Sequence, residues 1–136
     1  MNFKKLLICT LVVFFGICVS DYLIHGVILR NLYLDTAPLW RPESEMMAYM
    51  GHRFFGQFIT SFFFSLIFAK GYEGKGMLEG ARFGLILGGF EMGQHFVMHA
   101  VAPYPVLLTL LWICFGFIQS VFVGIIASLV YGKSKS

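Results

Sequence analysis

Hydrophobic residues gather in four long blocks along the chain, separated by short polar segments. Each block is about as long as the roughly 20 residues that a helix needs to cross the hydrocarbon core of a membrane. Pro42, followed by Glu43 and Glu45, is typical of a helix start and extends the second block towards the N-terminus. The pattern therefore predicts four helices, at about residues 6–29, 43–69, 77–102 and 106–131.

The composition indicates a membrane protein. The chain of 136 residues is 58% hydrophobic and only 12% charged, whereas soluble domains carry about 25% charged residues. We predict an all-α integral membrane four-helix bundle, a single transmembrane domain over residues 1–136, with the lipid bilayer as its first partner. The net charge of +3 is small, and the basic residues lie at the ends of the apolar blocks. We therefore expect no binding to nucleic acid.

The first block also has features of a secretory signal. Lys4 and Lys5 precede the apolar run, and Ser20 ends a passable cleavage site. The apolar run continues to Leu29, however, and this length suits a retained helix that spans the membrane. We therefore expect the first helix to remain part of the protein.

Basic residues are divided unequally between the two ends of the predicted bundle. The richer end holds Lys4, Lys5, Lys70, Lys75, Arg82, Lys133 and Lys135, and the other end holds Arg30, Arg41 and Arg53. Cytoplasmic segments of membrane proteins carry the excess of Lys and Arg. This bias predicts a multi-pass protein of the bacterial inner membrane, with both termini in the cytoplasm.

Small residues recur at every fourth position on the third and fourth predicted helices. Such rows allow two membrane helices to approach closely. A short turn with two prolines, residues 102–105, joins the helices and keeps them adjacent. We expect them to pack through Gly80, Gly84 and Gly88 on one side and Gly116, Ser120, Gly124 and Ser128 on the other.

Ionisable and amide residues inside the blocks fall in the half of the membrane away from the termini. Ionisable residues are costly within a membrane and usually mark pairing or function. The expected polar network consists of Asp21, His25, Arg53, Gln57, Glu91 and His95. Its simplest role is structural, with Arg53 neutralising a carboxylate and the histidines donating to neighbouring acceptors.

Two other roles remain open for the same residues. Imidazoles and carboxylates on facing helices can bind a divalent metal, or two histidines can ligate haem, and the candidates are His25, Glu91, His95 and His99. The intervals do not match the Glu-x-x-His motif of di-iron bundles. Alternatively, Glu91 or Asp21 forms the site of a small proton- or cation-coupled transporter, although no helix is broken by proline as in many transporters. No Ser or Cys stands in a nucleophile motif, and no catalytic residue is predicted.

Several short motifs resemble those of a group of small bacterial four-helix inner-membrane proteins of unknown function. The motifs are Asp21-x-x-x-His25-Gly26, Leu32-Tyr33, Leu39-Trp40-Arg41-Pro42-Glu43 with Met46, the segment 70–76, and Glu79-Gly80-x-Arg82-x-Gly84. The resemblance covers most of the chain and implies fold and location but no activity. The segment 91–95 is not part of the resemblance.

We therefore expect a non-enzymatic role, as an accessory or structural subunit that forms a homo-oligomer or joins a larger membrane complex. The alternatives are a metal- or haem-binding membrane protein and a small proton- or cation-coupled transporter. The cofactor, if any, is not identified by the sequence, because no haem or metal motif is matched.

Overall fold

A computed structural model of the protein describes residues 2–132. Within this range the chain is all-helical and contains no strand. The α-helices of this range are α1 (Phe3–Asp21), α2 (Arg30–Asp35), α3 (Glu43–Ala48), α4 (Met50–Lys70), α5 (Met77–Val101) and α6 (Val106–Gly132). Lys133 and Lys135, which the charge comparison above includes, lie outside the described residues.

The helix boundaries differ from the expected ones in two places. A π-helix, Tyr22–Ile28, continues α1, and α2 and a 3₁₀ turn, Ala37–Leu39, then occupy the connection that the sequence pattern leaves without helix. The expected second helix is split into α3 and α4, because the backbone of Tyr49 leaves helical angles at φ −99° and ψ 5°. Gly51, a weak helix former, follows this break.

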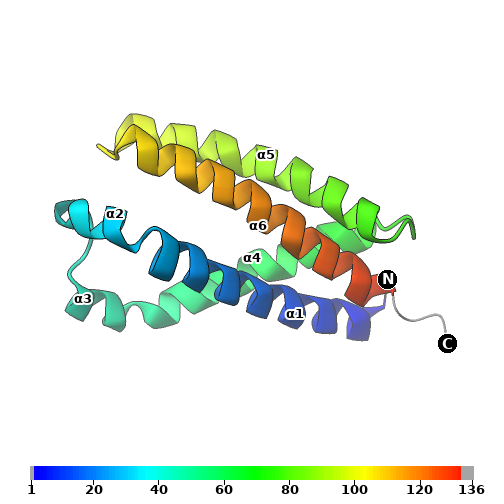
Figure 1. Ribbon diagram of the computed structural model, residues 1–136. Helices are drawn as coiled ribbons and strands as arrows, with labels where there is room; N and C mark the ends of the chain where they lie inside the picture. Colours follow the sequence, from blue (N-terminus) through cyan, green and yellow to red (C-terminus); the bar gives the residue numbers. More distant parts are fainter. Residues whose placement is uncertain (1, 133–136) are drawn as a thin grey trace.

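The four long helices lie side by side along the length of the molecule (Figure 1). Helix α1 packs against α4 and α6, and α5 packs against α6. The start of α1, the end of α6 and the α4–α5 connection lie at one end, which we call the terminal end (Figure 1). The short helices α2 and α3 and the α5–α6 turn lie at the opposite end, which we call the distal end.

Backbone contact between α5 and α6 is the closest packing in the molecule. A Cβ atom built on Gly80 would overlap the backbone oxygen of Gly124, and one built on Gly84 would overlap the backbone oxygen of Ser120. The two rows of small residues thus lie against each other, and Gly80, Gly84 and Gly124 have no room for a Cβ atom on the side that faces the other helix. Gly116 does not take part, because a Cβ there would lie 3.9 Å from the Glu91 carboxylate.

The bundle is filled most completely towards the terminal end. Its largest buried cluster consists of Cys9, Val13, Phe64, Phe68, Val123, Ala127 and Tyr131. Phe83 of α5 packs against Phe64 and Phe68 of α4, with ring centroids 4.9 Å and 5.3 Å apart. These aromatic contacts hold α4 and α5 together at this end of the bundle.

The same two helices are separate towards the distal end. Every residue of α4 from Gly51 to Thr60 is exposed except Gln57. From Phe90 to Val101, α5 is likewise exposed except at Glu91, His95 and His99. No hydrogen bond, ion pair or ring contact joins these two segments among residues 2–132. The distal half of the bundle is therefore open between α4 and α5.

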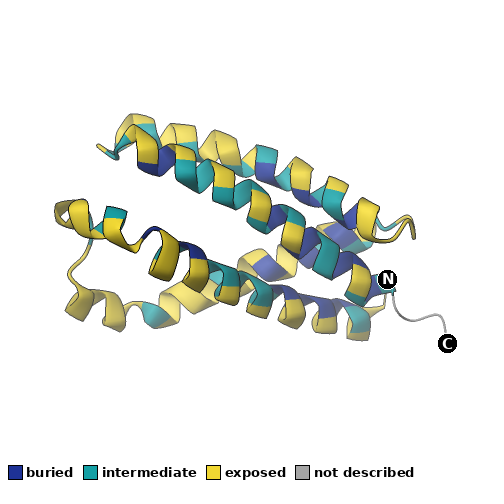
Figure 2. Ribbon diagram, viewed as in Figure 1, coloured by how far each residue is buried: buried dark blue, intermediate teal, exposed yellow. Residues whose placement is uncertain are grey.

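The exterior of the bundle is apolar. More large hydrophobic side chains are exposed than buried in the described chain, and Figure 2 shows exposed residues along the outward side of every long helix. Phe55, Ile86, Phe90 and Ile118, for example, are each more than 60% exposed. Soluble monomers rarely present continuous apolar surfaces of this extent.

Two helical stretches, Phe3–Ile28 and Val106–Gly132, are long and apolar enough to cross a membrane, by length and composition alone. The sequence pattern predicts four membrane spans, but in the described part of the chain only these two stretches meet the criteria of length and composition. Helices α4 and α5 contain charged, amide and histidine residues, such as Arg53, Gln57 and Glu91, which lower their hydropathy.

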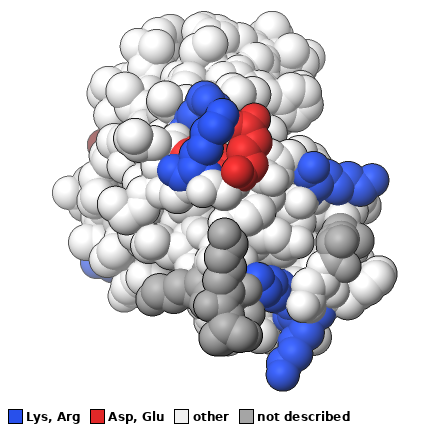
Figure 3. Space-filling model, turned by 90° about the vertical axis from the view of Figure 1, so that its right-hand side faces the viewer, with Lys and Arg blue, Asp and Glu red and all other residues white. Residues whose placement is uncertain are grey.

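Charged residues gather at the terminal end, which Figure 3 views directly. Glu73 forms ion pairs with Lys75 at 2.6 Å and with Arg82 at 3.1 Å. The hydrogen bonds from these two side chains lower the pKa of the Glu73 carboxyl. The buried carboxylate of Glu79 accepts bonds from the backbone N–H groups of Glu73 and Lys75, and it fixes the loop between α4 and α5.

The tight contact between α5 and α6 predicts that two Gly→Ala substitutions on α5 differ greatly in their effect on stability. Gly84→Ala places a methyl group against the α6 backbone and is expected to destabilise the protein by about 1–3 kcal/mol, as overpacking does. Gly93→Ala has no atom within 4 Å of the added carbon and should leave stability unchanged or raised. Thermal unfolding of both purified variants in detergent measures the difference, and equal midpoints would contradict the packing described.

Candidate functional site

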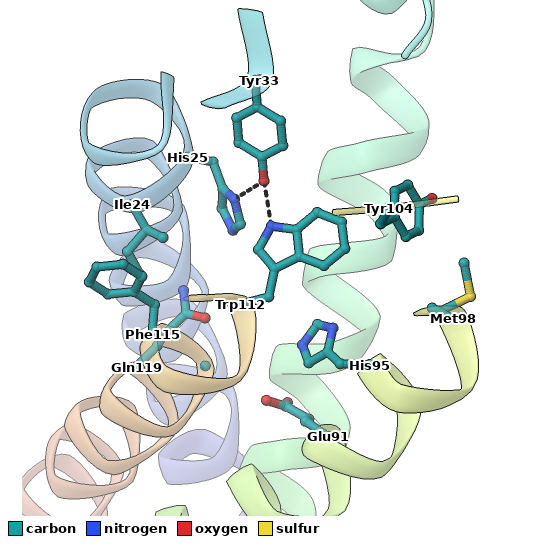
Figure 4. Close-up of a pocket in the computed structure, with 11 residues that line it drawn as sticks. Ile24, His25, Tyr33, Glu91, His95, Met98, Tyr104, Trp112, Phe115 and Gln119 are labelled. Atoms are coloured by element: carbon teal, nitrogen blue, oxygen red, sulfur yellow. Dashed lines mark hydrogen bonds between the residues drawn. The ribbon is translucent and has the colours of Figure 1, made fainter. Parts of the chain in front are cut away.

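A cavity of about 380 Å³ lies in the distal half of the bundle (Figure 4). Its walls come from the π-helix, α2, α5, the α5–α6 turn and α6, and no residue of α4 lines it. The lining residues are Ile24, His25, Tyr33, Glu91, His95, Met98, Tyr104, Trp112, Phe115, Gly116 and Gln119. Cavities of this size hold small organic molecules in other proteins.

Beside the cavity, Asp21 at the end of α1 is bound from two neighbouring helices. Its carboxylate accepts hydrogen bonds from Gln57 of α4 and from Gln119 of α6, the latter at 2.7 Å. Arg53 lies 3.8 Å from the same carboxylate. Asp21 is mostly buried, with its side chain 19% exposed, so its charge is compensated by an arginine and two amide donors. This group joins three helices at one point.

The π-helix presents His25 to a hydrogen-bonded chain of aromatic residues. In a π-helix each N–H bonds five residues back, as Leu29 does to Ile24 at 2.8 Å. Trp112 donates its indole N–H to the Tyr33 hydroxyl at 2.7 Å, and that hydroxyl lies 2.6 Å from Nδ1 of His25 (Figure 4). Because the indole N–H of Trp112 can only donate, the Tyr33 hydroxyl accepts from it and can give its own proton to Nδ1 of His25.

Glu91 and His95 project from α5 into the cavity (Figure 4). Ser120 donates its hydroxyl to Glu91 at 3.1 Å. No cation of the described chain forms an ion pair with Glu91, in contrast to Asp21. His95 packs against the Trp112 ring at 5.8 Å and has no hydrogen-bond partner within residues 2–132. Both side chains thus present polar atoms to the cavity whose hydrogen-bonding capacity is not filled by other residues of the described chain.

Four aromatic residues pack together beside the cavity and form what we call the aromatic cap: Tyr33 and Trp40 from the connection after α1, Tyr104 from the α5–α6 turn and Trp112 from α6. Trp40 stacks on Tyr104 with centroids 5.4 Å apart and planes at 7°. Tyr104 meets Trp112 edge to face at 5.2 Å, and Tyr33 meets Trp40 at 5.3 Å. The cap ties the connection that follows α1 to the α5–α6 turn.

Three of the four candidate metal ligands, His25, Glu91 and His95, line the cavity, and the fourth, His99, does not. His99 is paired with Thr109 at 3.2 Å, and Nδ1 of His25 is occupied by Tyr33. Among residues 2–132, no group of three or more His, Cys, Asp or Glu side chains is arranged to hold a metal ion. The set His25, Glu91, His95 and His99 that the sequence raises is therefore not assembled as a metal centre.

The residues of the expected polar network lie in two adjacent groups. Asp21, Arg53 and Gln57 form the compensated group, whereas His25, Glu91 and His95 line the cavity. The sequence pattern does not identify Gln119, Ser120 and the aromatic cap as members of the site. Tyrosine and tryptophan are also enriched where membrane proteins meet the water–lipid interface, and the position of the cap at the distal end is compatible with that role as well.

The compensated group predicts that Asp21 is needed for stability. Asp21→Ala leaves Gln57, Gln119 and Arg53 without their common acceptor, so we expect the free energy of unfolding to fall by about 1–3 kcal/mol. Asp35→Ala removes a carboxylate that is exposed on α2 and should change stability by less than about 0.5 kcal/mol. Denaturant unfolding in detergent compares the two, and an equal loss would show that Asp21 is not a structural acceptor.

Comparison with protein families, with curated proteins and with solved structures finds no match to this chain. The resemblance described from the sequence motifs implies no activity. A function for this protein is therefore derived from the chemistry of the cavity and its surroundings.

Proposed function

We propose that the protein is a multi-pass protein of the bacterial inner membrane that binds a small molecule in its distal cavity, without catalysing a reaction. In this proposal α1 with the π-helix, α4, α5 and α6 cross the bilayer as a four-helix bundle. The apolar exterior on all four helices supports this placement, because lipid is the solvent that such a surface requires.

The orientation follows from the charges. Lys4, Lys5, Lys70, Lys75 and Arg82 belong to the terminal end, and Arg30, Arg41 and Arg53 to the distal end. Under the positive-inside rule the terminal end faces the cytoplasm, so both termini are cytoplasmic and the cavity lies in the outer half of the membrane. The polar end of each tryptophan in the aromatic cap suits this depth.

The cavity with its free polar groups is the observation that carries the binding role. A purely structural network would pair its buried carboxylate, as Asp21 is paired. Glu91 instead has one serine donor and His95 has a ring contact, and both face an open volume. A mostly apolar wall with a few polar groups that face the cavity is typical of ligand sites.

A second candidate is the accessory or structural subunit that the sequence favours. The distal segments of α4 and α5 are exposed on the sides that face each other, and a partner helix would cover them. A metal-binding role has less support, since no group of three or more His, Cys, Asp or Glu side chains among residues 2–132 is arranged to hold a metal ion. A cation-coupled transporter remains a special case of the binding role.

The cavity proposal predicts that Gly116 is reachable from the outer side of the membrane. A Cβ on Gly116 would point towards Glu91 and His95 without overlap. In a chain lacking the three native cysteines, Gly116→Cys should react with a membrane-impermeant maleimide added to intact cells. Ala127→Cys, at a position that is 0% exposed, should remain unlabelled.

Lys75→Cys supplies the control for orientation and should react only after the membrane is permeabilised. Labelling of this cysteine in intact cells would reverse the proposed topology. A Gly116→Cys side chain that reacts only after denaturation would mean that the cavity is closed, and it would favour the structural subunit instead.

A further inference from the structure

We infer that the distal cavity selects a lipophilic organic cation, with the Glu91 carboxylate as its counter-charge. This inference rests on the proposed binding role and names the class of ligand. It depends on three features of the site: the charge that faces the cavity, the rings that line it and the route by which it is reached.

The first feature is an uncompensated negative charge. Of the two carboxylates near the cavity, Asp21 has Arg53 at 3.8 Å and two amide donors. Glu91 has only the neutral Ser120 hydroxyl. Nδ1 of His25 is engaged by the Tyr33 hydroxyl, and no ion pair joins His25 or His95 to Glu91 within residues 2–132. An ionised Glu91 therefore makes the cavity a site for positive charge.

The second feature is the ring surface opposite that charge. Trp112, Tyr104 and Tyr33 line the same cavity as Glu91 (Figure 4). A cation gains from the negative face of an aromatic ring, most of all from tryptophan, and the gain is larger where water is excluded. A carboxylate combined with such rings favours an ammonium group that carries apolar substituents over a small, strongly hydrated metal ion.

The third feature is the opening between α4 and α5. No residue of α4 lines the cavity, and the segments of α4 and α5 in the distal half carry exposed large apolar residues such as Phe55, Ile59 and Phe90. In the proposed membrane placement this opening faces the outer leaflet. A ligand that dissolves in lipid can enter there, whereas a strongly hydrated ion would lose its water.

The chain contains a built-in reporter for this test, because its two tryptophans are Trp40 and Trp112 of the aromatic cap. Phenyltrimethylammonium and its neutral isostere tert-butylbenzene differ in charge but hardly in shape. Titration of the purified full-length protein in mild detergent should give a saturable change in tryptophan fluorescence with the cation, at a concentration at least about tenfold lower than with the isostere. Equal affinities for the two probes would overturn the inference without the use of any variant.

Two variants identify the counter-charge. Glu91→Gln keeps the size of the side chain and is expected to weaken binding of the cation by about tenfold or more, since a buried charge loses its partner, with little effect on the isostere. Asp35→Asn removes one negative charge from the exposed surface of α2 and should leave both affinities unchanged. Unchanged cation binding in Glu91→Gln would overturn the role of Glu91.

The two proposals fail in different ways. If Gly116→Cys is labelled from outside but both probes bind equally, the cavity is a binding site and the inferred selectivity is wrong. If Gly116→Cys is unreactive in the folded protein, the binding role is wrong and the inference fails with it.

Discussion

The direct backbone contact between α5 and α6 is the constraint on which the rest of the structure depends. Where Gly80 meets Gly124 and Gly84 meets Ser120, the backbones approach until a Cβ atom on any of the three glycines would overlap the other helix. The row ends at Gly88, where the added Cβ would meet the ring of Phe117 rather than a small residue. Beyond this ring α5 presents Glu91 and His95, so the cavity begins where the close contact stops.

Two carboxylates in the same half of the molecule show how packing decides the chemistry of a residue type. Asp21 stands where three helices converge and receives donors from two of them. Glu91 stands where α4 has separated from α5, and its one hydrogen-bond donor among residues 2–132 is Ser120 of α6. The Asp21 carboxylate joins helices, whereas the Glu91 carboxylate keeps hydrogen-bonding capacity for a ligand.

The sequence predicts the features that depend on residues close together in the chain. The extents of the long helices and the two rows of small residues follow from periodicity, because a helix repeats every 3.6 residues. The split at Tyr49 and the π-helix over Tyr22–Ile28 leave no periodic signal. The site is only partly predictable for the same reason: Glu91 and His95 are recognisable as polar residues in an apolar block, whereas the bond from Trp112 to Tyr33 joins positions 79 residues apart.

The aromatic contacts of Phe83 with Phe64 and Phe68 have a mechanical consequence for the molecule. They join α4 and α5 near the terminal end, while about 27 Å of α5, from Phe83 to Val101, extends past them at 1.5 Å per residue. Both helices are also held further along: α5 by its backbone contact with α6, and α4 by the Asp21 carboxylate, which binds Gln57 of α4 and Gln119 of α6. The opening between α4 and α5 is therefore a fixed gap, closed at Phe83 and kept apart beyond it by these two separate attachments to α6.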